Sequence, residues 1–169
     1  MKLTFYKLDP SVNVPKKATT GSACFDLEYR PWQKPSVVNV WRAQDRSPRD
    51  RLINAADGSI ILMPGERALL PTGLIANIPE GYSLRAHPRS GKSIKEGLTL
   101  INAEGVIDSD YVEEIMITII NHGPEAKIMP GDRMAQLELV QTLEYDIGET
   151  KKRPGQKTER AGGFGSTGK

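Results

Sequence analysis

The chain has 169 residues, of which 38% are hydrophobic and 26% charged, and this composition predicts one soluble globular domain with a substantial core. No apolar run approaches the roughly 20 residues that a membrane span needs, and no signal peptide follows Met1, so we expect a cytoplasmic protein, or one of the host cytoplasm if its source is viral. One cysteine, Cys24, and two histidines supply too few side chains for a zinc centre or a histidine-based triad.

The net charge of +2 is unevenly distributed. Residues 149–169 contain six Lys or Arg and two Glu, whereas the rest of the chain contains 17 basic and 19 acidic residues. We therefore expect a domain of residues 1–148 followed by a flexible C-terminal arm of residues 149–169. The basic arm either contacts an anionic ligand or is a solvated polar tail.

In chain order, the first polar turn is ATTGSACFDL at residues 18–27, which leads from glycine and serine to Asp26. Residues 31–59 follow and are too long for an ordinary loop. We expect residues 37–40 to pair with residues 52–53 in a hairpin around the charged tip RAQDRSPRDR, which is either a decoration or an arm that binds a partner. Asp45 and Asp50 cancel half of the charge of its arginines (Arg42, Arg46, Arg49 and Arg51), so no direct binding of nucleic acid is expected.

Prolines and glycines recur every few residues between Pro64 and Gly131, which leaves no room for long helices. Short apolar runs between them predict an all-β sandwich or barrel, with a helix of barely a turn or two at residues 92–96. The sequence MAQLELV alternates and predicts a strand with Met134, Leu137 or their neighbours on a buried face. The expected strands are at 60–63, 67–70, 98–101, 114–120 and 134–140.

The stretch HPRSGKSIKEG contains Gly-Lys-Ser, the end of a P-loop pattern. A P-loop needs a glycine five residues before Gly91, and Ala86 occupies that position. The useful part of the stretch is therefore PRSG, which combines the cation of Arg89, the hydroxyl of Ser90 and the backbone N–H of Gly91.

Three further segments carry polar groups suited to a site. NAEGVIDSDY at residues 102–111 places Asp108 and Asp110 beside Tyr111, and GDRMAQLEL at 131–139 contains Arg133 and Gln136. The last segment, RAGGFGSTGK at 160–169, surrounds Phe164 with Gly, Ser and Thr. Because that composition buries little surface, the segment is either a mobile tail or a flap that becomes ordered on a ligand.

In this order and spacing, the five segments resemble the five motifs of the trimeric deoxyuridine triphosphatases (dUTPases). GVIDSDY and GGFGSTG are the most specific parts of the match. The resemblance implies a distorted β jelly roll and a homotrimer whose active sites are shared between subunits. It also implies hydrolysis of dUTP to dUMP and pyrophosphate with Mg²⁺ on the triphosphate, a reaction of nucleotide metabolism that keeps uracil out of DNA.

The resemblance assigns roles to individual residues. Asp108 is the general base that orients the water attacking the α-phosphorus, and Asp26 holds Mg²⁺ through water. Asn102 and the backbone of Gly105, Val106 and Ile107 read the uracil edge, with Met116 nearby, and Tyr111 lies under the deoxyribose. Phe164 stacks on the base, and the phosphate contacts are Arg89, Ser90, Gly91, Gln136, Arg160, Ser166 and Thr167.

This chain departs from the family pattern at several positions. Cys24 and Glu113 stand where glycines are common, Lys92-Ser93 where small or apolar residues are common, and the last motif is one residue short between Arg160 and Phe164. Two alternatives share the fold: a dCTP deaminase-like enzyme and a nucleotide-sensing module without turnover. The deaminase uses a glutamate where this chain has Thr118, and a sensing module does not need Asp108.

Overall fold

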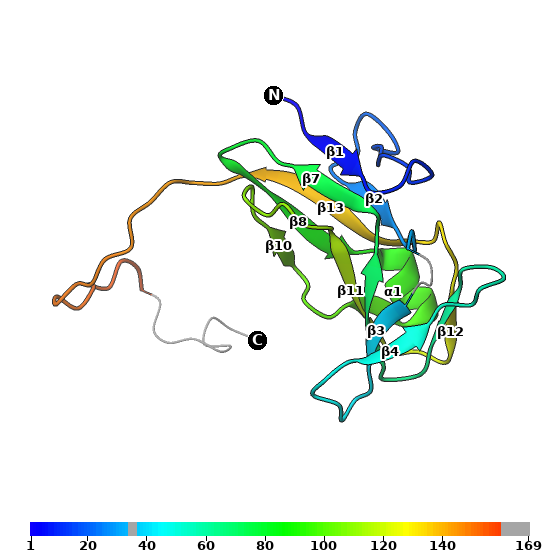
Figure 1. The fold of residues 1–169 in the computed structure, drawn as a ribbon. Helices are drawn as coiled ribbons and strands as arrows, with labels where there is room; N and C mark the ends of the chain where they lie inside the picture. The colour runs from blue at the N-terminus through cyan, green and yellow to red at the C-terminus, as the bar shows by residue number, and fades with distance from the viewer. Residues whose placement is uncertain (34–36, 160–169) are drawn as a thin grey trace.

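The computed structural model describes residues 1–33 and 37–159, which form short strands and one helix (Figure 1). The elements in chain order are β1 (Thr4–Lys7), β2 (Phe25–Glu28), β3 (Val37–Trp41), β4 (Arg49–Leu52), β5 (Ile60–Leu62), β6 (Arg67–Pro71), β7 (Leu74–Asn77), β8 (Tyr82–Pro88), α1 (Ser90–Glu96), β9 (Leu98–Leu100), β10 (Gly105–Ile107), β11 (Met116–Asn121), β12 (Ala126–Ile128) and β13 (Arg133–Gln141). The prediction of an all-β protein with one short helix is confirmed.

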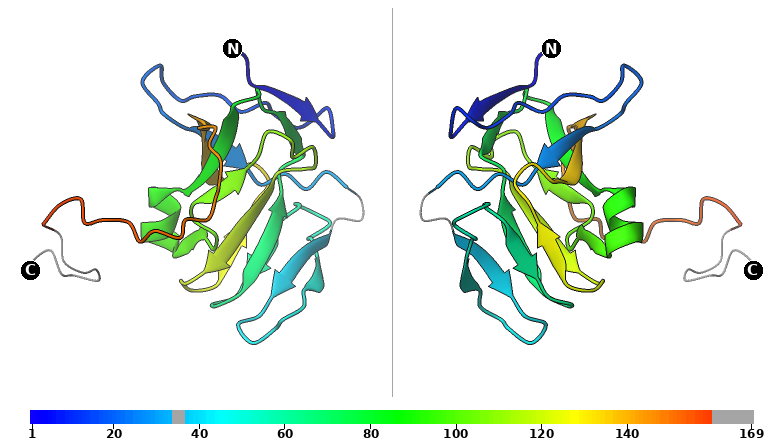
Figure 2. Two further views of the ribbon diagram at one scale, coloured as in Figure 1. Left: turned by 90° about the vertical axis from the view of Figure 1, so that its left-hand side faces the viewer. Right: turned by 90° about the vertical axis from the view of Figure 1, so that its right-hand side faces the viewer.

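Two antiparallel sheets form the body of the protein. One has the strand order β10-β8-β13-β2, and the other has the order β4-β3-β6-β11-β9. Strand pairs β1-β7 and β12-β5 form two smaller sheets. Most neighbours within the sheets are distant in sequence, as in β13 with β2 and β3 with β6, and the two views in Figure 2 show how these segments are arranged in space.

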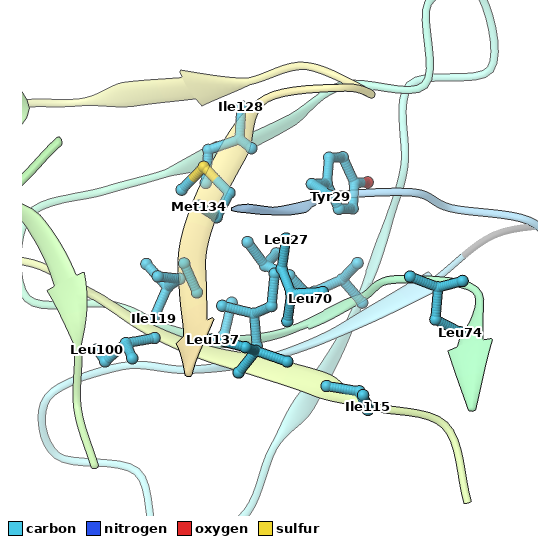
Figure 3. Close-up of a cluster of buried hydrophobic side chains, with 14 of the residues drawn as sticks. Leu27, Tyr29, Leu70, Leu74, Leu100, Ile115, Ile119, Ile128, Met134 and Leu137 are labelled. Carbon is cyan, nitrogen blue, oxygen red and sulfur yellow. The ribbon is translucent and has the colours of Figure 1, made fainter. Parts of the chain in front are cut away.

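The core lies between the two larger sheets. Leu27 and Leu137 come from the four-stranded sheet, Leu70 and Ile119 from the five-stranded sheet, and all four are at most 1% exposed (Figure 3). Several strands, among them β2, β3, β6, β7 and β11, bury alternate residues, because successive side chains of a strand point to opposite faces. The buried pattern of β6, for example, places Ala68 and Leu70 in the core and the residues between them outward.

Strand β13 departs from strict alternation at Met134. Arg133 pairs with Glu28 and Ala135 with Leu27, so β13 has one extra residue at this point, a β-bulge. The bulge allows Met134 and Leu137 both to be buried although an odd number of positions separates them, as expected from the sequence. It also turns Arg133 out of the sheet at the edge of the candidate site described below.

The hairpin predicted within residues 31–59 is confirmed, with Val37 paired to Leu52. It is also joined to the body, because β3 pairs with β6 and buries Val38 and Val40. Strand β4 is fixed by Arg51, which forms two hydrogen bonds of 2.6 and 2.7 Å with the buried carboxylate of Glu66. This pairing raises the pKa of Arg51 and lowers the pKa of Glu66.

Helix α1 begins two residues earlier than the sequence predicted and ends at Glu96, and the φ of +72° at the next residue, Gly97, favours glycine. A side chain at Gly97 would also collide with the backbone of Gly123. After β13, residues 142–159 contain no helix or strand and extend away from the sheets (Figure 1). Among the described residues, no helix is long and apolar enough to cross a bilayer.

Candidate functional site

A cavity of about 210 Å³ opens beside β10, between the edges of the two large sheets. Its floor is apolar and comes from both sheets, for example from Leu27, Leu100 and Ile117. Its rim includes every sequence-predicted residue of the base and sugar site that the structure describes: Asn102, Gly105, Val106, Ile107, Asp108, Tyr111 and Met116. We refer to this cavity as the hairpin pocket.

One part of the hairpin pocket's lining is polar. Thr118 on β11 donates a hydrogen bond from Oγ1 to Oδ1 of Asn102, which leaves the Asn102 amide N–H groups available to a ligand. Gly105 lies close to both neighbouring walls, since a Cβ there would stand 3.0 Å from Asn102 Nδ2 and 3.3 Å from the Ala86 Cβ. Glycine at this position therefore keeps the pocket open to a flat polar ring.

Asp108 and Tyr111 share the turn that follows β10. The Tyr111 backbone N–H donates to the Asp108 carbonyl oxygen at 3.2 Å, and the Tyr111 hydroxyl donates to the Glu114 carbonyl oxygen at 3.0 Å. Tyr111 is thus held at its backbone and at its hydroxyl, while 40% of the residue remains exposed toward the cavity and solvent. Asp108 is exposed at the mouth of the pocket, where its carboxylate can contact a water molecule and a ligand together.

A second, more polar hollow of about 250 Å³ lies where β2, β13 and the start of α1 meet. We refer to it as the cationic hollow. The Asp26 carboxylate is held between Arg89 Nε at 2.7 Å and Arg133 Nη1 at 3.0 Å. The hollow is lined by Ala18, Ser22, Cys24, Asp26, Arg89, Ser90, Gly91, Arg133 and Gln136.

Further hydrogen bonds fix the shape of the cationic hollow. Arg89 donates from Nη1 to the Arg133 carbonyl oxygen at 3.1 Å, and Gln136 donates from Nε2 to the Pro88 carbonyl oxygen at 3.0 Å. Ser90 and Gly91 open α1 and are exposed. Two guanidinium groups, a hydroxyl, an amide side chain and exposed backbone N–H groups converge here, a set of donors suited to a phosphate chain.

Cys24 packs in the cationic hollow and does not act as an anion there. Burial, followed by the negative charge of Glu138, raises the pKa of its thiol. The Gly-Lys-Ser lysine, Lys92, is also occupied, because its ammonium group pairs with Glu96 at 2.8 Å and lies 3.9 Å from Asp132. These contacts agree with the sequence interpretation that Gly-Lys-Ser is not the end of a P-loop.

The two hollows have no lining residue in common. Asp108 and Tyr111 therefore belong to one hollow of this subunit, and Asp26, Arg89, Ser90, Gly91 and Gln136 belong to the other. The predictions for Arg160, Phe164, Ser166 and Thr167 lie outside the described residues. Within the described ranges, no group of three or more His, Cys, Asp or Glu side chains is placed to hold a metal ion.

Sequence reasoning missed two residues that the structure places in these hollows. Arg133 was noted within its motif but was given no role, although it holds Asp26. Thr118 was considered only as a position that lacks a glutamate, although it orients Asn102. The alternation of β11 could have placed Thr118 on the same face as Met116, but no local pattern links Arg133 to a residue 107 positions away.

Comparison with known proteins gives one consistent result. The dUTPase family model matches residues 53–168. The deoxyuridine 5'-triphosphate nucleotidohydrolase of Chlamydia pneumoniae is 36% identical over 165 residues, which are 97% of each chain. The protein of the same name from Bdellovibrio bacteriovorus is 47% identical over 114 residues, covering 66% of this chain and 75% of the relative.

Solved structures show the same fold. A dUTPase of Staphylococcus bacteriophage 80alpha with dUPNHPP superposes with a TM-score of 0.75 at 20% identity, over 99% of this chain and 98% of its own. A mutant dUTPase of phage phi11 of S. aureus, described with a structural Mg(II) ion, gives a TM-score of 0.69 at 20% identity, over 92% of this chain and 100% of its own. At these identities the structures confirm the jelly-roll fold alone.

Proposed function

The chain belongs to the dUTPase family, and on that premise we propose that it hydrolyses dUTP to dUMP and pyrophosphate. The observation that carries the proposal is the hairpin pocket, which is lined together by Asn102 oriented by Thr118, by the exposed carboxylate of Asp108 and by the tethered ring of Tyr111. A separate hollow of cationic and N–H donors supplies what a triphosphate needs. This function belongs to nucleotide metabolism and keeps uracil out of DNA.

We propose that the hairpin pocket binds the deoxyuridine part of the substrate. The Asn102 amide and the backbone of Gly105, Val106 and Ile107 bind the uracil edge, and Met116 packs beside the base. The Tyr111 ring lies under the deoxyribose and leaves no room for a 2′-hydroxyl. Phe164, from the last motif, stacks on the base.

The phosphates bind to the donors of the cationic hollow, which are Arg89, Ser90, Gly91 and Gln136, together with Arg160, Ser166 and Thr167 of the last motif. Phosphoryl transfer depends mainly on positioning and on neutralising charge. Asp108 orients a water molecule in line with the α-phosphorus and accepts its proton as the P–O bond forms and pyrophosphate leaves. An exposed carboxylate is a weak base, so the fixed position of Asp108 in its turn contributes much of its effect.

The residues of the cationic hollow fit a hydrated Mg²⁺ that is bound to the triphosphate. Mg²⁺ prefers oxygen ligands and keeps several of its waters, so one carboxylate such as Asp26 is sufficient to bind it through water. Bound there, the ion neutralises phosphate charge. In the free subunit Arg89 and Arg133 occupy both Asp26 oxygens, and the incoming phosphates compete for these arginines.

We also propose a homotrimer with shared active sites. The two hollows of one subunit share no lining residue, which supports an active site built from the hairpin pocket of one copy and the cationic hollow of a neighbouring copy. Residues 142–148 support an arm that crosses to this neighbour, since Leu143, Tyr145 and Ile147 alternate with polar residues and are 82%, 78% and 89% exposed. Light scattering tests the assembly, and an active monomer would contradict it.

The two alternatives of the same fold make different products. A dCTP deaminase-like enzyme needs a glutamate at the position of Thr118, which here donates to Asn102. A nucleotide-sensing module binds dUTP and releases no product. Incubation of the protein with dUTP, dCTP or UTP and Mg²⁺, followed by chromatography of the products, separates the three functions: dUMP and pyrophosphate support the proposal, and dUTP released from dCTP, or no product from dUTP, contradicts it.

The location in the cytoplasm and the absence of direct nucleic-acid binding stay predictions. The arginines of the β3–β4 hairpin are partly neutralised, as Arg49 pairs with Asp45 at 3.1 Å and Arg51 with Glu66 at 2.6 Å. The division between residues 1–148 and 149–169 also stays a prediction.

A further inference from the structure

Glu114 lies just outside the hairpin pocket and receives an unusual number of hydrogen bonds on one oxygen. Its Oε1 atom accepts the backbone N–H of Gly73 at 2.6 Å, the backbone N–H of Thr72 at 3.0 Å and the indole N–H of Trp32 at 3.1 Å. Thr72 and Gly73 form the buried connection between β6 and β7. One carboxylate oxygen thus ties together three segments that are far apart in sequence.

The main chain beside this carboxylate is fixed to the same connection. The Ile115 N–H donates to the Leu74 carbonyl oxygen at 2.8 Å, and the Thr72 hydroxyl donates to the Ile115 carbonyl oxygen at 2.7 Å. Ile115 is 2% exposed, and Thr72 is 1% exposed. Residues 114 and 115 therefore have little freedom to move as long as the Glu114 side chain is in place.

The fixed main chain in turn holds the aromatic ring of the pocket. The Glu114 carbonyl oxygen accepts a hydrogen bond from the Tyr111 hydroxyl, and among the described residues this is the only hydrogen bond of that hydroxyl. The Tyr111 backbone N–H is bonded to Asp108 at the other end of the turn. Displacement of residue 114 would move the ring at the position where the sugar is expected to lie.

Trp32 connects this cluster to the segment of residues 31–59. A groove of about 100 Å³ beside Trp32 is lined by Val37 and Asn39 of β3, and it shares Met116 with the hairpin pocket. The indole N–H is therefore a contact between the segment that carries the β3–β4 hairpin and the wall of the pocket. Neither Trp32 nor Glu114 lines the hairpin pocket itself.

We propose that Glu114 is a positioning residue for sugar selection, and that Trp32 makes this selection depend on the segment of residues 31–59. The proposal depends on the proposed function, because it takes the Tyr111 ring as the surface that rejects a 2′-hydroxyl. A tethered ring rejects the extra oxygen sterically. A ring whose tether has been loosened shifts, admits UTP and binds dUTP almost as before.

The test is steady-state hydrolysis of dUTP and of UTP by the full-length protein and five variants. Glu114→Ala removes the acceptor of three hydrogen bonds and Trp32→Phe removes the donor of one. The ratio of kcat/KM for dUTP to that for UTP is expected to fall about tenfold in Glu114→Ala and about threefold in Trp32→Phe. Most of the change in this ratio should come from a rise in kcat/KM for UTP. Glu114→Gln, which keeps an acceptor oxygen, should restore most of the selectivity.

The neighbouring Glu113→Ala is the matched control for Glu114, and Trp41→Phe, on β3, is the matched control for Trp32; both should keep the wild-type ratio. Melting curves accompany each assay. If Glu114→Ala melts at a lower temperature and loses activity on both substrates equally, or if it and Trp32→Phe keep the wild-type ratio, the inference is wrong. A wild-type protein that does not hydrolyse dUTP would instead contradict the proposed function.

Discussion

The hairpin pocket and the cationic hollow differ in the chemistry of the residues that line them. The pocket is lined by apolar residues from both sheets, and two of its polar side chains are fixed by hydrogen bonds, Asn102 by Thr118 and Tyr111 by the Glu114 carbonyl oxygen. The charged side chains of the hollow are paired with one another, Asp26 with both Arg89 and Arg133.

This difference separates selectivity from affinity. On the proposed function, the fixed shape of the pocket is expected to discriminate between ligands that differ by one atom. The phosphates compete with Asp26 for the arginines of the hollow, so the hollow is expected to contribute binding energy that depends on ionic strength. The comparison therefore predicts that substitutions in the two regions change different kinetic quantities.

The largest effect is expected for Asp108→Asn. Loss of a positioned general base lowers kcat by about 10³-fold, while the isosteric amide leaves binding of dUTP largely intact. Single-turnover kinetics and calorimetric titration with a non-hydrolysable dUTP analogue measure the two effects separately. Full activity in this variant would remove Asp108 from the mechanism, and equal losses of binding and turnover would place it with the binding groups.

Arg89→Ala should show the opposite behaviour, because it removes a phosphate donor from the cationic hollow. We expect kcat/KM for dUTP to fall about 10²-fold with little change in the ratio of dUTP to UTP. The fall in kcat/KM with added salt should also be shallower than in the wild-type protein, since one charge fewer attracts the substrate. Arg49→Ala, which removes an exposed arginine paired with Asp45, is the control and should leave all three quantities unchanged.

Tyr111→Ala tests the pocket alone. Removing the ring opens space for a 2′-hydroxyl, so the ratio of kcat/KM for dUTP to that for UTP should fall about ten- to hundredfold, mainly through better use of UTP. If the ring only supports the turn, the melting temperature falls, both substrates lose activity alike and the ratio stays constant. The two assays and a melting curve distinguish these results.

The sequence predicted the fold well where local rules decide it. Breakers and alternating residues located β5, β6, β9, β11 and β13, and the hairpin of residues 37–53 followed from two apolar runs around a charged tip. The remaining strands, β1, β2, β7, β8, β10 and β12, were not among the expected strands. Asp108 and Tyr111 were likewise predictable as neighbours, because three positions within one turn place them together. The order of the five motifs indicated the ligand, which the pattern of apolar residues and breakers alone does not.

Contacts between distant segments were not predictable from the single sequence. The pairing of β13 with β2 brings Arg133 to Asp26, and the β6–β7 connection brings Thr72 and Gly73 to Glu114. Both depend on strand order, which the alternation of residues does not determine. The bulge at Met134 has the same origin, since it appears only when β13 is placed beside its partner.

The last prediction concerns a charge pair that belongs to neither hollow and so should affect stability without affecting the reaction. Arg51 forms hydrogen bonds to Glu66, whose side chain is 6% exposed, and these bonds lower the pKa of Glu66 below its usual value of 4.5. A carboxyl group with a lowered pKa in the folded protein stabilises it above about pH 4.5 and loses this contribution as the pH falls through the folded pKa. Glu66→Gln should therefore lower the free energy of unfolding by about 1.5 kcal/mol near neutral pH, and the gap to the wild-type protein should narrow as the pH falls below about 4.5.

Urea unfolding at a series of pH values measures the gap. The control is Asp45→Asn, because its partner Arg49 is 60% exposed and such pairs contribute little to stability. If the difference in the free energy of unfolding stays constant down to about pH 3, the contribution of Glu66 to stability does not depend on its charge. If the ratio of dUTP to UTP hydrolysis changes, Glu66 influences the hairpin pocket although it does not line it.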